Sequence, residues 1–242
     1  MPGRHSEKLL MLPGLMCDAR MFGPQIAHLP DAQAVDGYGT RDSLAAMARY
    51  VLDQAPQRFS LLGHSMGARV AMEVFRAAPE RVARLALVST GAHGTREGEA
   101  EKRHALRDLG RREGMLALVD AWLPPMIAAR RRGEEGLVSP LRDMCVASGL
   151  ETFEAQVAAL LGRPEIETLL AKIRCPVLVA AGSEDVWSPP EQHAEIASQI
   201  PGARLVIIAG AGHMLPVEAP DALNAAIARW MSEPAQPQSQ KV

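Results

Sequence analysis

The sequence is poor in cysteine and in aromatic residues. Its 242 residues include only three cysteines, Cys17, Cys145 and Cys175, with no C-x-x-C pair among them. Such scattered thiols predict neither a disulfide framework nor a zinc site, and we expect no metal and no other cofactor. The aromatic content is 4%, and together with the methionines this favours an aliphatic, adaptable pocket.

The net charge is also small, and no long apolar run is present. The formal charge is −2 with a pI near 6.4, so electrostatics give no reason to expect nucleic acid or an anionic membrane surface as a partner. No apolar run approaches the ~20 residues that span a bilayer, and the first residues lack the apolar region of a signal peptide. We expect a cytoplasmic protein that acts on a small-molecule substrate, in an oligomeric state that the sequence does not indicate.

A serine stands between a predicted strand and a predicted helix. Residues 59–62 have the pattern of a short buried strand, and apolar residues recur at helical spacing up to Phe75. The residues between them, Gly63-His-Ser-Met-Gly67, predict a turn so tight that larger side chains in place of the glycines would collide with the strand and the helix. Ser65 is therefore predicted to project at the carboxyl end of a sheet, in front of a helix N-terminus. The alternative is that Ser65 only caps the helix.

The strand pattern predicts an α/β fold. Strands are predicted at residues 8–12, 32–36, 59–62, 84–90, 176–181 and 203–208. Their alternation with helical patterns predicts a mostly parallel, doubly covered sheet of about six strands, joined by right-handed crossovers. Residues 91–164 contain only helical patterns broken by glycine and proline, which favours a helical lid inserted after the fourth strand. We thus predict a core at 1–90 and 165–233, the lid at 91–164 and a disordered tail at 234–242.

Two further polar side chains follow two later strands. Asp185 comes after the strand at 176–181, and His213 comes after the strand at 203–208. Because the carboxyl ends of parallel strands meet at one edge of a sheet, both side chains should lie near Ser65. A serine hydroxyl attacks a carbonyl when a histidine takes its proton and a carboxylate orients the imidazole. The chain order Ser, Asp, His is typical of α/β-hydrolases, so the sequence predicts nucleophilic acyl transfer.

The sequence offers alternatives for the acid and for the histidine, and it leaves the positions of two nearby residues open. Glu184 stands beside Asp185 as an alternative acid. His64 precedes the serine, but at such a turn it is expected to pack or to bond a loop rather than to act in catalysis. His93 could face the pocket or merely begin the lid, and Trp187 could line the acyl pocket or pack its own loop.

Four motifs resemble those of the α/β-hydrolase fold superfamily across nearly the whole chain. They are similar to its oxyanion loop, nucleophile elbow, acid loop and histidine loop, and they read Leu12-Pro-Gly-Leu15, Gly63-His-Ser-Met-Gly67, Gly182-Ser-Glu-Asp185 and Gly210-Ala-Gly-His-Met214. The chain is most similar to the small lidded members grouped with esterases, enol-lactonases, pimeloyl-carrier methyl esterases and meta-cleavage-product hydrolases. The resemblance implies an oxyanion hole formed by the backbone N–H groups of Leu15 and Met66.

The chain departs from the superfamily pattern near its start. Pro13 stands where most members carry histidine, so the oxyanion loop is held by different contacts in this chain. Leu15 remains the expected donor, with Met16 as the competing one. Only seven residues precede the first predicted strand, so we expect the usual N-terminal hairpin to be missing. Candidate pocket residues flank the catalytic loops or lie in the lid: Met16, Trp122, Met126, Trp187 and Met214.

The leading hypothesis is a cofactor-free serine hydrolase that cleaves a small carboxylic ester, thioester or lactone through an acyl-enzyme. Serine at the apex, in place of aspartate, argues against the dehalogenase and epoxide hydrolase branches. An alternative uses the same triad to cleave a carbon–carbon bond in a vinylogous diketone or to open an enol-lactone. A third hypothesis is a small-molecule receptor that retains the triad, as plant hormone receptors of this fold do. Repeated turnover separates an enzyme from such a receptor.

Overall fold

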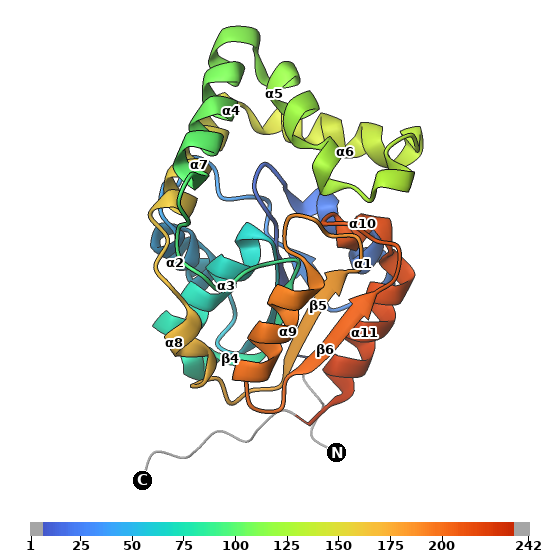
Figure 1. The fold of residues 1–242 in the computed structure, drawn as a ribbon. Helices are drawn as coiled ribbons and strands as arrows, with labels where there is room; N and C mark the ends of the chain where they lie inside the picture. Colours follow the sequence, from blue (N-terminus) through green and yellow to red (C-terminus); the bar gives the residue numbers. More distant parts are fainter. Residues whose placement is uncertain (1–6, 235–242) are drawn as a thin grey trace.

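Six parallel strands form one sheet in the order β2-β1-β3-β4-β5-β6 (Figure 1). In this computed structural model, which describes residues 7–234, the strands are β1 (Leu9–Leu12), β2 (Ala32–Ala34), β3 (Phe59–His64), β4 (Val82–Val88), β5 (Val177–Gly182) and β6 (Arg204–Ile208). The four central strands are buried along their whole length, because helices cover both faces of a parallel sheet. The predicted α/β fold class with six strands is confirmed, with strand ends displaced by one or two residues.

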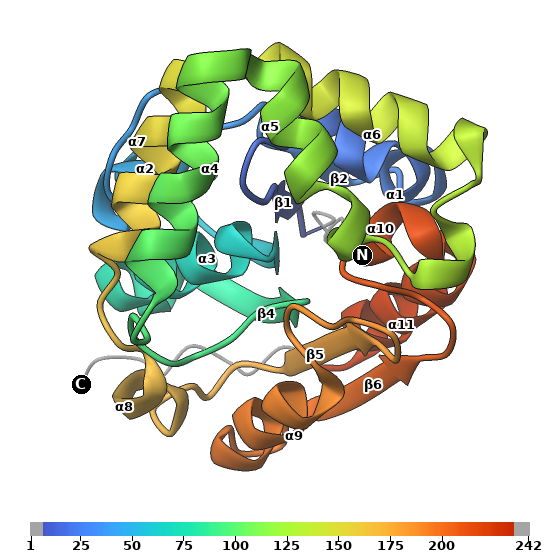
Figure 2. The same ribbon diagram turned by 45° about the horizontal axis from the view of Figure 1, so that its top comes forward.

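Helices pack on both faces of the sheet. One face carries α2 (Leu44–Gln54), α3 (Met66–Ala77) and α9 (Pro190–Gln199), and the other carries α1 (Gly23–His28) and α11 (Pro220–Ser232) (Figures 1 and 2). A 3-10 turn, Ala19–Phe22, comes before α1 and does not continue into it as one helix. Pro24 explains the break, because proline lacks the N–H that would continue a helix and is favoured in the first turn of a new one.

Between β4 and β5 the chain forms a helical insert, by which we mean α4 to α7. Its main helices are α4 (Glu99–Glu113), α5 (Met115–Trp122), α6 (Glu135–Ser148) and α7 (Leu150–Leu161), and the short α8 (Glu167–Leu170) leads back to the sheet. Gly114, with a φ of 89°, separates α4 from α5, and Gly149, with a φ of 80°, separates α6 from α7. The insert lies beyond the carboxyl ends of the strands, where the sequence predicts a lid (Figures 1 and 2).

No single helix within residues 7–234 is long and apolar enough to cross a membrane; α6 and α7, which meet at a bend of 87°, reach that length and composition only as a pair. The predicted tail falls, apart from residue 234, outside the described residues.

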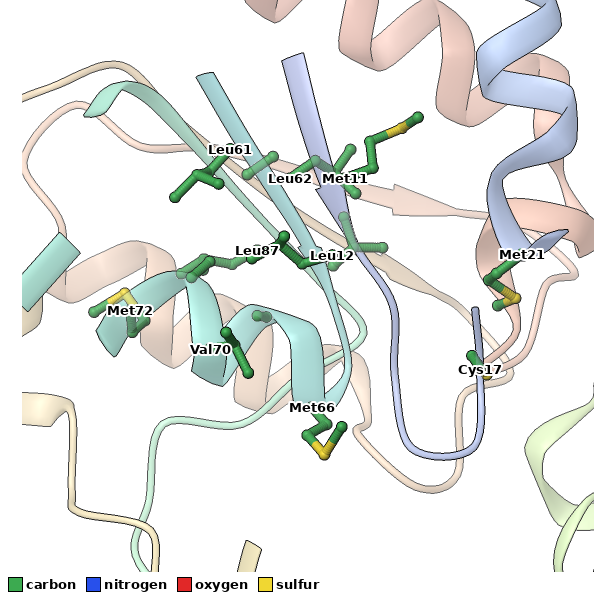
Figure 3. Close-up of a cluster of buried hydrophobic side chains, with 14 of the residues drawn as sticks. Met11, Leu12, Cys17, Met21, Leu61, Leu62, Met66, Val70, Met72 and Leu87 are labelled. Atoms are coloured by element: carbon green, nitrogen blue, oxygen red, sulfur yellow. The ribbon is translucent and has the colours of Figure 1, made fainter. Parts of the chain in front are cut away.

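The core lies between the sheet and its helices. Figure 3 shows part of it, with labelled side chains contributed by β1, by the segment that follows β1, and by β3, β4 and α3. Leu61, Leu87 and Met72 are among those with no exposed surface, and full burial of such a side chain stabilises the fold by roughly 1.5–3 kcal/mol. The packed core fixes the relative positions of the strand ends, and with them the loops described next.

Candidate active site

Ser65 lies at the turn between β3 and α3 in a backbone conformation that side chains rarely adopt. Its φ is 56° and its ψ is −117°, and strain of this kind costs of order 1–3 kcal/mol. The end of β4 holds the residue in place, because the Ser65 N–H donates to Val88 O (2.8 Å) and the Ser65 carbonyl accepts from Thr90 Oγ1 (3.1 Å). The turn therefore presents the hydroxyl at the carboxyl edge of the sheet.

Two glycines allow this turn. A Cβ on Gly67 would lie 2.0 Å from the Leu12 carbonyl oxygen, and a Cβ on Gly63 would lie 2.4 Å from Ala68 Cα. Both approaches are shorter than any real side chain tolerates and both involve backbone atoms, which cannot rotate away. The glycines thus let the first turn of α3 pack directly against β1 and β3, as the sequence motif predicts.

Ser65, His213 and Asp185 form one continuous chain of hydrogen bonds. His213 Nε2 lies 2.9 Å from Ser65 Oγ, and His213 Nδ1 lies 2.9 Å from Asp185 Oδ2. An imidazole that donates its Nδ1–H to a carboxylate leaves Nε2 free to accept the serine proton. The structure thus brings together three residues that follow β3, β5 and β6.

Asp185 occupies the position beside the imidazole. Its second oxygen, Oδ1, accepts the N–H groups of Trp187 (2.9 Å) and Ser188 (2.8 Å). Burial alone would raise the pKa of the Asp185 carboxyl, but the His213 interaction and the Ser188 N–H outweigh it and hold the pKa below its usual value. The alternative acid, Glu184, is partly exposed and lies 3.4 Å from Arg130. The acid loop therefore presents one carboxylate to the imidazole.

His64 fixes the backbone of the histidine loop. Its ring is buried, and its Nε2 donates to the carbonyl oxygen of His213 over 2.8 Å. Burial and the nearby His213 lower the pKa of His64 to about 3, so the ring is uncharged at neutral pH. This geometry fits the loop-bonding role that the sequence favours for His64.

Glu218, which the sequence reading missed, orders the same loop from the other side. Its carboxylate accepts the N–H groups of Gly212, Met214 and Ala128, each at 3.0 Å. Burial raises the pKa of this carboxyl, against the opposing effect of the three donors. A glutamate shortly after His213, in the short helix α10 (Leu215–Glu218), is the sequence signal that could have identified it.

The two predicted oxyanion donors, Leu15 and Met66, lie on separate segments that meet at the cavity. Leu15 and Met66 both line the cavity beside Ser65, and Met66 is the first residue of α3, where a helix leaves N–H groups unpaired. The N–H of Met16, the competing donor, is held by Gln156 Oε1 at 2.8 Å. The hydrogen-bond pattern therefore favours Leu15 over Met16. Gln156, a buried residue of α7, was not identified from the sequence.

A cavity of about 330 Å³ opens next to Ser65 and His213, between the sheet edge and the helical insert. Trp122, Met126 and Trp187 line it, and so does His93, whose orientation the sequence leaves open.

Met16 and Met214, the two other predicted pocket residues, do not line the cavity. Each is only 1% exposed and packs in the hydrophobic core. Each also follows a residue that does line the cavity, Leu15 or His213.

Charged residues make up much of the remaining cavity wall, and none of them was predicted. The basic ones are Arg69, Arg96, Lys102, Arg103 and Arg163, and the acidic ones are Glu97 and Glu99. In the part of the chain that the structure describes, no three His, Cys, Asp or Glu side chains are grouped so that they could hold a metal ion.

Comparisons with known proteins find related sequences along most of the chain. Residues 9–226 match the profile described as the alpha/beta hydrolase family. A putative carbamate hydrolase of Azorhizobium caulinodans is 30% identical over 240 residues, which cover 89% of this chain and 88% of the relative. A putative non-heme bromoperoxidase of Mycobacterium tuberculosis is 29% identical over 211 residues, covering 81% of this chain and 77% of the relative.

Two solved structures extend the similarity to the arrangement of the elements. A thermophilic esterase from Thermogutta terrifontis superposes with a TM-score of 0.85 at 27% identity, over 93% of this chain and 89% of its own. The enol-lactonase of Burkholderia xenovorans superposes with a TM-score of 0.85 at 25% identity, over 96% of this chain and 94% of its own.

Proposed function

The chain belongs to the alpha/beta hydrolase family, and on that basis we propose that it is a serine hydrolase that cleaves a small carboxylic ester, thioester or lactone through an acyl-enzyme. The observation that carries this proposal is the unbroken set of hydrogen bonds from Asp185 through His213 to Ser65, at the wall of a cavity. In this proposal Ser65 is the nucleophile, His213 the general base and Asp185 the orienting carboxylate.

The geometry supports a two-step reaction. His213 Nε2 takes the proton of Ser65 Oγ as that oxygen attacks the carbonyl carbon, and Asp185 stabilises the imidazolium that forms. The N–H groups of Leu15 and Met66 stabilise the developing oxyanion, each by roughly 3–4 kcal/mol. The imidazolium then protonates the leaving group, and a water molecule activated by the same histidine releases the acid.

The names of the relatives support carbonyl hydrolysis as the common chemistry. They include an esterase, an enol-lactonase and a putative carbamate hydrolase. The enol-lactonase similarity supports a second candidate, opening of an enol-lactone by the same three residues. Cleavage of a carbon–carbon bond, which also uses a serine, histidine and aspartate, is the remaining enzymatic alternative.

Steady-state hydrolysis of p-nitrophenyl esters with rising acyl length tests the proposal. We expect repeated turnover with an optimum of chain length, and a fluorophosphonate should label Ser65 and abolish the activity. The labelled peptide is identified by mass spectrometry. If the fluorophosphonate labels Ser65 but no ester turns over, the esterase proposal is wrong, and the lactonase, the carbon–carbon hydrolase and the receptor are the functions to examine.

Gln156 is expected to act as a positioning residue for the oxyanion loop. In Gln156→Ala the Met16 N–H loses its acceptor in a buried place, which costs about 1–3 kcal/mol. The adjacent Leu15 N–H then loses its fixed direction. We expect kcat for ester hydrolysis to fall about tenfold, with little change in KM.

The matched control is Gln54→Ala, which removes an exposed glutamine from α2 far from the cavity and should leave kcat unchanged. Thermal unfolding separates the positioning role from a purely structural one. A Gln156→Ala protein with a lowered Tm and an unchanged kcat would show that Gln156 only packs α7 against the core.

A further inference from the structure

The cavity wall carries more positive than negative charge. Five of its residues are basic and two are acidic, although the whole chain has a formal charge of −2. The excess is therefore local to the cavity. Concentrating one sign of charge in a concave, partly desolvated site raises the local concentration of ligands of the opposite sign.

Two of these cations share one carboxylate. Glu99, at the start of α4, lies 2.6 Å from Arg163 and 2.8 Å from Arg103. The Arg163 guanidinium also donates to the carbonyl oxygens of Leu160 and Gly94. These contacts use most of the donors of Arg163 and connect the start of α4 to the end of α7, which indicates a structural role for Arg163.

Of the three other basic residues of the wall, Arg96 and Lys102 are exposed, and only Arg69 is buried. Within residues 7–234 it forms no salt bridge, and its one hydrogen bond runs from Nη1 to the carbonyl oxygen of His93 at 3.0 Å. A guanidinium has five N–H groups, so most of its donors are unused. The residue is only 7% exposed and lines the cavity.

The position of Arg69 places it close to the reacting atoms. It lies four residues after Ser65, one turn into α3, at a Cα separation of roughly 6 Å along the helix. Helical side chains tilt towards the helix N-terminus, which here is the end that faces the cavity. His93, the other polar group nearby, carries no charge at neutral pH, because burial and Arg96 lower its pKa to about 4.

We propose that Arg69 binds a carboxylate group of the substrate. The proposed hydrolase would then act on esters or lactones that carry a free carboxylate in addition to the bond that is cleaved. This inference rests on the proposed function and names its substrate class. A planar guanidinium with unused donors matches a carboxylate in a bidentate fashion.

The surroundings of Arg69 favour such an anion energetically. Burial and the charge of Arg163 lower the pKa of Arg69 to about 9. The surroundings of the side chain therefore destabilise its charged form. An incoming carboxylate relieves that cost, whereas a neutral substrate leaves the cation desolvated and unpaired. A charge-assisted hydrogen bond of this kind is worth roughly twice a neutral one, so Arg69 should discriminate between charged and uncharged substrates of the same shape.

Two pairs of isosteric substrates test the proposal on both sides of the ester bond. The acyl pair is the mono-p-nitrophenyl ester of adipate against that of adipamate, and the alcohol pair is p-carboxyphenyl against p-carbamoylphenyl hexanoate. We expect kcat/KM of the wild-type protein to favour the anion about 30-fold in at least one pair. Arg69→Gln should reduce that preference to about threefold or less, and Arg69→Lys should restore part of it.

Arg111→Gln is the matched control, because it removes the same charge from the exposed face of α4 at a residue that does not line the cavity. It should leave the preference unchanged. Absence of a preference in both pairs, or a preference that survives in Arg69→Gln with an unchanged Tm, would overturn the inference while neutral-ester turnover still supports the proposed function.

Binding of adipate measured by calorimetry provides a readout that does not need turnover. We expect Kd to rise about 30-fold in Arg69→Gln and to stay constant in Arg111→Gln. If no ester is hydrolysed but adipate binding depends on Arg69, the proposed function fails and the anion site stands. Equal adipate binding in wild type and Arg69→Gln would refute the site whatever the activity.

Discussion

Substitution of Ser65 by alanine is expected to lower kcat for ester hydrolysis by about 10³-fold or more. The change removes the atom that attacks the carbonyl but leaves the oxyanion donors, the imidazole and the cavity in place. Activity measured on the best ester of the chain-length series, with the fluorophosphonate label as a second readout, checks the prediction. The label should no longer attach.

The backbone at Ser65 supplies an independent control. Alanine keeps the Cβ and with it the strain of a φ of 56°, so the Tm of Ser65→Ala should stay close to that of the wild type. Ser65→Gly removes the Cβ and should stabilise the protein by about 1 kcal/mol while being equally inactive. Ser198→Ala, at a serine on the exposed face of α9, should leave both properties unchanged. Appreciable turnover by Ser65→Ala would rule out Ser65 as the nucleophile.

Gly67→Ala is expected to cause the largest loss of stability among conservative changes near the site. The added methyl group would lie 2.0 Å from the Leu12 carbonyl oxygen and 2.6 Å from that of Pro13. Neither can move unless β1 and α3 separate, and overpacking of this severity costs about 3 kcal/mol or more. Separation would also displace the Leu15 and Met66 N–H groups. We therefore expect a markedly lower free energy of unfolding in urea and a loss of ester hydrolysis.

Gly136→Ala provides the comparison, because the same methyl group added in α6 meets no atom within 4 Å. Replacing glycine by alanine in a helix stabilises it slightly, so this variant should be as stable as the wild type or more so. If Gly67→Ala unfolds at the same urea concentration as Gly136→Ala, the close approach of α3 to β1 is not a requirement of the fold.

The sheet, the elbow and the three polar residues could be predicted because each depends on local sequence. The strands are continuous apolar runs, and the residues that follow them lie at one edge of any parallel sheet. Ser65, Asp185 and His213 could therefore be placed together before any distance was known, and the structure puts His213 within hydrogen-bonding distance of both Ser65 and Asp185. The spacing of Gly63 and Gly67 around Ser65 predicts the tight turn, because larger side chains at these positions would collide with the strand and the helix.

Residues whose roles depend on the packing of the insert could not be predicted in this way. Gln156 and Arg163 lie on or next to α7, and the side-chain contacts that matter here, to Met16 and Glu99, bridge more than 60 residues of the chain. No periodicity indicates which face of a broken helix points inward. Arg69 was missed for a different reason, since an arginine four residues after the serine reads as an ordinary polar helix position until its burial is known. Met16 and Met214 were assigned to the pocket from adjacency alone, and adjacency does not fix a direction.

The insert also bears on the order in which the molecule can assemble. Strands β4 and β5 are neighbours in the sheet, yet the whole insert separates them along the chain, so their pairing closes a loop whose entropic cost is about 4 kcal/mol for a flexible chain of that length. Ser65 lies before this loop, whereas Asp185 and His213 lie after it. During refolding, helical circular dichroism should therefore recover before fluorophosphonate reactivity does, and the delay between them reports the rate at which β5 joins the sheet.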